Sequence, residues 1–159
     1  MRLSLKVTFV AALLATTFAA NAGTADPIVK RMLDAKGTPF EVDADGDYKI
    51  IVSYKSEGRT QLVYVRSAVE TWGKQRIREV WSYAYQAPSN QFSALVANRL
   101  LQASNEVKLG AWVKQKDRAL MIVKVNADAS AEELDNAISF AAEVADEMEK
   151  ELTDGGDEF

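Results

Sequence analysis

The sequence predicts one α+β domain: an antiparallel sheet with helices packed on one face, in the order α-β-β-β-β-α-β-β-α. Three observations support this prediction. Segments with apolar side chains at every second residue alternate with three segments in which apolar side chains recur every three or four residues. The links between neighbouring strands have hairpin length, which forces antiparallel pairing. Each expected helix has one apolar stripe, which suits a single helix layer on one sheet face.

Length and composition fit one globular domain and narrow the chemistry. The 159 residues include 48% hydrophobic and 26% charged side chains, which is average for a soluble globular protein. Cysteine is absent, which excludes a disulfide scaffold, thiolate metal sites and thiol catalysis. Histidine is also absent, which removes the most common general base and metal ligand.

Residues 1–22 have the three-part pattern of a secretory signal peptide. Arg2 and Lys6 form a positive start, an apolar run occupies 7–20, and small residues precede a cleavage site after Ala22. The apolar run is shorter than the roughly 20 residues that a membrane-spanning helix needs. We therefore expect a periplasmic or secreted protein with no transmembrane segment after signal cleavage, and an uncleaved N-terminal helix is the alternative.

The charge balance argues against polyanionic partners. Without residues 1–22 the chain has 17 Lys and Arg against 23 Asp and Glu, a net charge of −6. Because nucleic acids and anionic membranes attract Lys and Arg, we expect no nucleic-acid partner. Acidic side chains gather near the C-terminus, and 154–159 is expected to be an acidic flexible tail, with a docking element as the alternative.

The first half of the chain predicts one helix and four strands. Asp26 and Pro27 supply the N-cap and the first helical position, and Gly37 supplies the left-handed residue after the helix. The stretch around Thr71, Trp72 and Gly73 has no clear pattern. The four strands are expected at 40–43, 48–55, 61–66 and 75–85.

The second half predicts a helix, a hairpin and a last helix. Pro88 and Ser89 are expected to cap a helix over 90–104, with its apolar stripe at Phe92, Leu95, Val96 and Leu100. Strands at 108–114 and 118–126 form a hairpin, and the second strand is central because 119–123 is apolar on both faces. Ser130 and Glu133 form a capping box for the last helix. That helix repeats apolar residues at Leu134, Ile138, Ala141, Ala145, Met148 and Leu152.

The sequence contains no recognisable catalytic or cofactor motif. The serines lack a nucleophile-elbow motif, and no glycine-rich phosphate loop occurs. Asp43, Asp45 and Asp47 resemble part of a calcium loop, but glycine falls at the fourth position and Tyr54 stands where the bidentate glutamate belongs. An Asp-Gly hairpin turn is therefore favoured, and we expect no catalytic residue, no cofactor and no metal site.

Five large aromatic side chains are the candidate partner-binding residues. Such amphipathic side chains are common at binding sites, and they also build cores. The alternation of residues 75–85 places three of them on one strand face, whereas Trp72 lies outside any alternation. Both interpretations, binding face and core, remain open for these residues. The five are Trp72, Trp81, Tyr83, Tyr85 and Trp112.

Several local strings together resemble the YbjN-like family, described as bacterial sensory transduction regulators. The residues are Asn105, the Gly110-Ala111-Trp112 step into a strand, the helix start at 130–134, and Ala145-Asp146 followed by Glu149. The DADGDY hairpin also resembles the first half of the family. The resemblance implies that 23–153 is a single YbjN-like domain with a fold like that of type III secretion chaperones, which are often dimeric and bind proteins. It implies no catalytic residue.

We therefore expect an exported, non-enzymatic protein that acts through protein–protein contacts in a regulatory or chaperone-like role. Another protein is the expected partner, and a homodimer is possible. The contact surface would be the helix-free sheet face or a sheet edge that accepts an added strand. The alternatives are a periplasmic domain that binds a small ligand or an envelope polymer, and a hydrolase that uses a carboxylate pair.

Overall fold

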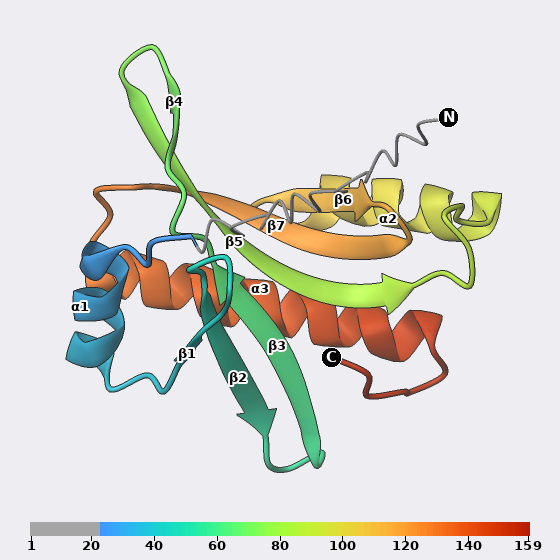
Figure 1. Ribbon diagram of the computed structural model, residues 1–159. Helices are drawn as coiled ribbons and strands as arrows, with labels where there is room; N and C mark the ends of the chain where they lie inside the picture. The colour runs from blue at the N-terminus through green and yellow to red at the C-terminus, as the bar shows by residue number, and fades with distance from the viewer. Residues whose placement is uncertain (1–22) are drawn as a thin grey trace, which may run out of the picture.

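The computed structural model describes residues 23–159, so the expected signal peptide at 1–22 lies outside the described residues. Three helices and a seven-stranded antiparallel sheet form the fold (Figure 1). The helices are α1 (Pro27–Lys36), α2 (Ala94–Glu106) and α3 (Ala131–Leu152). The strands are β1 (Glu41–Val42), β2 (Tyr48–Tyr54), β3 (Arg59–Val65), β4 (Glu70–Trp72), β5 (Gln75–Gln86), β6 (Ala111–Gln115) and β7 (Arg118–Asn126).

The helices cover one face of the sheet, which confirms the predicted α+β class. The sheet order is β1-β2-β3-β5-β7-β6, and β4 pairs with β5 alone. Helix α3 packs on β3, β5 and β7, α1 packs beside α3, and α2 packs on β6 (Figure 1). The face under α3 carries apolar residues such as Val65, Val80 and Val123. Arg99 of α2 pairs with Glu151 of α3 at 2.6 Å, which places both helices in one layer.

The helix caps follow the sequence closely at α1 and α3. Asp26 accepts a hydrogen bond from the Ile28 amide, and Gly37 adopts φ 67°. At α3, Ser130 and Glu133 form the expected capping box. Helix α2 begins at Ala94 instead of the expected Asn90, because Ser93 is the residue whose side chain accepts from a helical amide.

Strand β4 is an element that the sequence analysis did not assign. Trp72 pairs with Gln75 across a turn in which Gly73 has φ 59°, so five strands stand between α1 and α2. All three residues of β4 are exposed, which explains the missing alternation. Figure 1 shows β4 and the start of β5 as a ribbon that projects beyond the rest of the sheet.

A bulge in β5 separates aromatic residues that were expected to share a face. Tyr83 is opposite Leu120, but Tyr85 is opposite Ala119, because Ala84 is an extra residue in the ladder. Trp81 and Tyr83 therefore lie on the helix-free face, whereas Tyr85 turns to the helix side and packs on Phe92 at 5.8 Å between ring centroids. The expectation of one shared face is wrong for Tyr85.

Strands β3 and β5 diverge, and the C-terminal segment (154–159) returns to this gap. The two strands pair only from Val63 to Val65 on β3. Beyond that point the Thr60 amide donates to Asp157, and the ring of Phe159 lies 5.8 Å from that of Tyr83. Figure 1 shows the segment after α3 turning back toward the strands. The expected acidic tail thus makes specific contacts with the sheet.

Candidate functional site

The five candidate aromatic residues occupy four different environments. Trp72 is 83% exposed at the projecting ribbon, whereas Trp112 is 8% exposed and belongs to the core. Trp81 and Tyr83 are half-buried on the helix-free face, and Tyr85 packs on the helix side. The structure therefore does not bring them into one binding surface.

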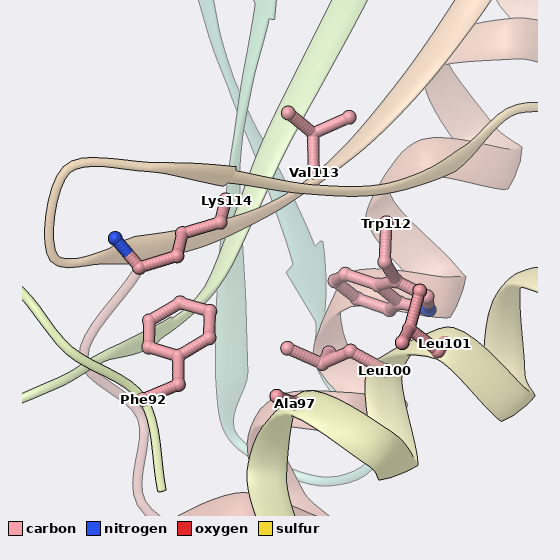
Figure 2. Close-up of a pocket in the computed structure, with 7 residues that line it drawn as sticks. All are labelled: Phe92, Ala97, Leu100, Leu101, Trp112, Val113 and Lys114. Atoms are coloured by element: carbon pink, nitrogen blue, oxygen red, sulfur yellow. The ribbon is translucent and has the colours of Figure 1, made fainter. Parts of the chain in front are cut away.

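Trp112 forms part of a groove between α2 and β6. The indole reaches from β6 over α2, and Lys114 extends over the ring of Phe92, with 5.3 Å from Nζ to the ring centroid (Figure 2). The groove contains a cavity of about 220 Å³. Its lining is apolar except for one lysine: Phe92, Ala97, Leu100, Leu101, Trp112, Val113 and Lys114. We call this feature the α2–β6 groove.

The outer edge of β6 borders the α2–β6 groove and has backbone groups free to bond. Strand β6 is the last in the sheet and pairs with β7 alone. The Trp112 amide points away from β7, because it donates to Ser104 Oγ on α2 at 2.9 Å. Since backbone groups in an antiparallel pair alternate in direction, Lys114, two residues further on, also turns its N–H and C=O outward. The Trp112 amide is already bonded to α2, so the backbone groups that this edge offers to another strand are those of Lys114.

Several large apolar side chains between residues 95 and 113 are exposed, and two of them, Leu101 and Val113, line the α2–β6 groove. Leu95 is 81% exposed, Leu101 69%, Leu109 47% and Val113 39%. Within residues 23–159 these are four of the seven large apolar side chains that stand out as exposed, and they fall in one short stretch of the chain. Exposed apolar side chains beside a groove are typical of a contact with another protein.

Leu95 contradicts its predicted place in the buried stripe of the second helix. The stripe is narrower than expected, because α2 packs on β6 at the margin of the sheet and buries only Leu100 and Ala103. The sequence signal for the α2–β6 groove was limited to the adjacent apolar residues Leu100 and Leu101, of which the first is buried and the second exposed. Periodicity alone assigned them to the core.

Two buried carboxylates meet at Arg59 rather than in an open cleft. Arg59 Nε lies 2.7 Å from Asp146, and Nη2 lies 3.2 Å from Glu149. Burial raises the pKa of Glu149, although the amide of Glu158 and the charge of Arg59 act in the opposite direction. Both carboxylates are occupied by structural partners, so this cluster ties α3 to β3 and to the C-terminal segment.

The three aspartates of the DADGD string serve the turn between β1 and β2. Asp43 accepts hydrogen bonds from the amides of Asp45 and Asp47, each at 2.9 Å. Asp47 accepts from the Ser67 amide and pairs with Arg66. Gly46 adopts φ 81°, where a side chain would meet the backbone of residue 23. Over residues 23–159 no group of three or more acidic residues is placed to hold a metal ion.

Compared with known proteins, the chain matches no family model and no curated protein. The resemblance to the YbjN-like family thus stays a prediction. None of the helices in the described part of the chain has the length and apolar character needed to cross a membrane.

Proposed function

We propose that this chain is an exported, non-enzymatic protein that binds an extended segment of another protein in the α2–β6 groove. The observation that carries the proposal is a sheet edge with free backbone groups beside an apolar, helix-walled groove. This is the arrangement that strand addition uses, in which backbone hydrogen bonds give affinity and alternate side chains enter pockets. The resemblance to a protein-binding family supports the same role.

In the proposed complex the added strand lies along the outer edge of β6. Its backbone would bond to the outward N–H and C=O of Lys114, and every second side chain would enter the α2–β6 groove beside Leu100 and Trp112. The intervening side chains would face away from α2, toward Val113, which Figure 2 shows on the opposite side of β6. We therefore expect a bound segment with apolar residues at alternate positions.

Peptide selection tests this proposal for a partner segment of any sequence. Random dodecapeptides displayed on phage are selected on the immobilised protein, and the strongest binders are then synthesised and titrated. Lys114→Pro removes an N–H that points away from β7, so the β6–β7 ladder is kept. We expect it to weaken binding about tenfold, as the loss of one hydrogen bond and the obstruction by the ring suggest. Lys114→Ala, the matched control, keeps the N–H and should bind nearly as well.

A second pair of variants distinguishes peptide binding in the α2–β6 groove from non-specific binding to exposed apolar side chains. Leu101→Glu places a charge in the groove and should abolish peptide binding. Ile51→Glu changes a comparably exposed side chain on β2 and should leave binding unchanged. Selected peptides without apolar alternation, or equal binding by both variants, would overturn the proposal. Concentration-dependent dimers that Lys114→Pro disrupts would identify a second copy of the chain as the occupant.

A further inference from the structure

We propose that the helix-free face of the sheet binds a small molecule that carries two anionic groups, carboxylate or phosphate. The site is a hollow of about 480 Å³ whose lining includes Arg66, Arg118, Trp81 and Tyr83. We call it the arginine hollow. It lies on the sheet face opposite α3, and the inference does not rest on the proposed protein-binding role.

The guanidinium of Arg66 is fixed by two neighbours, and its two terminal nitrogens remain able to donate hydrogen bonds to a ligand. Its guanidinium carbon lies 4.1 Å from the ring centroid of Trp81, and its Nε lies 2.9 Å from a carboxylate oxygen of Asp47. The indole is fixed in turn, since Trp81 Nε1 donates to Glu79 at 2.8 Å. The two terminal nitrogens of Arg66 make no hydrogen bond to any other residue of 23–159, so they form a fixed pair of donors.

Arg118 is a second arginine stacked on an aromatic ring. Its guanidinium carbon lies 5.0 Å from the ring centroid of Tyr83. That ring is supported by Tyr64 at 5.9 Å and by Phe159 at 5.8 Å. No carboxylate among residues 23–159 forms an ion pair with Arg118. Its positive charge is thus positioned by packing and left without a counter-ion.

Two cationic side chains of the arginine hollow form no ion pair within residues 23–159. These are Lys116 and Arg118, whereas the charge of Arg66 is balanced by Asp47 at 2.9 Å, and Asp45 and Asp117 also line the hollow. The Asp117 carboxylate already accepts a hydrogen bond from Gln86 at 2.8 Å, and Asp45 is exposed at the rim. Guanidinium donors match carboxylate and phosphate oxygens in geometry and charge.

The spacing of the Trp81 and Tyr83 rings indicates a ligand with two anionic groups. Trp81 and Tyr83 are two residues apart on one strand face, a separation of about 7 Å. One guanidinium is stacked on each ring, so neighbouring charged groups of one molecule can engage both. The volume lies within the range of about 300–1,000 Å³ that is typical of small-molecule sites.

Calorimetric titration of the protein with pyrophosphate and with citrate, at constant ionic strength, tests the inference. We expect saturable binding of at least one of them, and weaker binding of acetate. Arg118→Gln should weaken that binding about tenfold, because a charged hydrogen bond is lost. Arg118 has no ion-pair partner among the described residues, so the variant should fold. Arg118→Lys, which keeps the charge without the fork, is the second variant. Arg76→Gln is the matched control, since Arg76 pairs with Asp128 outside the hollow.

The titration results identify the class of ligand or overturn the inference. Binding of pyrophosphate alone would assign a phosphate ligand, binding of citrate alone a carboxylate ligand, and binding of both would support the shared chemistry. If neither pyrophosphate nor citrate binds saturably, the inference is overturned. Equal affinities in the native protein and in Arg118→Gln would also overturn it, because the anion would then bind elsewhere.

Discussion

Arg59 joins three parts of the chain that are distant in sequence. Its Nε donates to Asp146 on α3 at 2.7 Å, and its Nη1 donates to the carbonyls of Gly155 and Gly156 at 3.1 and 2.6 Å. Its Nη2 bonds to Glu149, which is fully buried. Because each buried charge has a partner, the desolvation cost is partly offset. Removing one member of the cluster would leave another buried charge without its partner.

The pH dependence of stability should reveal the burial of Glu149. Burial raises the pKa of this carboxyl above its ordinary value of 4.5 in the folded protein. The folded state therefore holds the proton more tightly than the unfolded state, and this contribution to stability is lost as pH rises through the folded pKa. Glu149→Gln cannot lose a proton. We expect the free energy of unfolding of the native protein, minus that of Glu149→Gln, to fall as pH rises from 4.5.

Urea unfolding at a series of pH values measures this difference. The side chains around residue 149 are the same in both proteins, among them Arg59, Asp146 and Asp157, so their contributions largely cancel in the difference. Glu143→Gln on the exposed side of α3 is the control and should stay within about 0.5 kcal/mol of the native protein at each pH. A difference for Glu149→Gln that is constant, or that grows with pH, would contradict the prediction.

Among the elements, α3 owes its defined start to a reciprocal pair of bonds. Ser130 Oγ accepts from the Glu133 amide at 3.2 Å, and Glu133 accepts from the Ser130 amide at 2.8 Å. Ser130→Ala removes one of these acceptors and should lower the free energy of unfolding by about 1 kcal/mol in urea titrations. Ser139→Ala, in the exposed middle of the same helix, should change it by less than about 0.5 kcal/mol. Equal losses in both variants would show that the cap contributes nothing.

Local signals explain which elements were predictable. The caps at Asp26 and Ser130 depend on residues within four positions of each other, so sequence alone identifies them. The bulge at Ala84 depends on the register between β5 and β7. An alternating pattern of apolar residues along one strand does not show where that register shifts by a residue. Strand β4 is held by its turn and its partner strand, so its own three residues carry no apolar pattern.

At the scale of the whole molecule, tertiary contacts that the sequence could not show define both candidate sites. Trp112 was a candidate binding residue, but its role in the α2–β6 groove depends on where α2 lies against the sheet edge. Arg66 and Arg118 were not singled out, since stacking on Trp81 and Tyr83 requires the register of β3, β5 and β7. The residues identified the strands and the hairpin partners β2–β3 and β6–β7. They did not show that β3 pairs with β5 or that β5 pairs with β7.

The C-terminal segment should contribute measurably to stability. Removing residues 154–159 takes two carbonyl acceptors from Arg59 and the Glu158 amide from Glu149, whose carboxylate accepts it at 2.6 Å. Buried groups left without partners cost about 1–3 kcal/mol, and we expect a loss of this size in urea unfolding. Glu158→Ala in the complete chain keeps the amide donor and should be nearly neutral. A truncated protein as stable as the native one would show that these contacts are dispensable.

The three tryptophans give the molecule a built-in optical reporter. Trp72 is exposed to water, Trp81 is stacked against the guanidinium of Arg66, and Trp112 is buried between β6 and α2. Their emission should therefore differ in wavelength and in accessibility to a collisional quencher such as iodide. Replacing Trp72 with phenylalanine would remove the solvent-exposed emitter. The remaining emission would then come from Trp81 in the arginine hollow and from Trp112 in the α2–β6 groove. A change in it would report ligand binding at these sites without any attached dye.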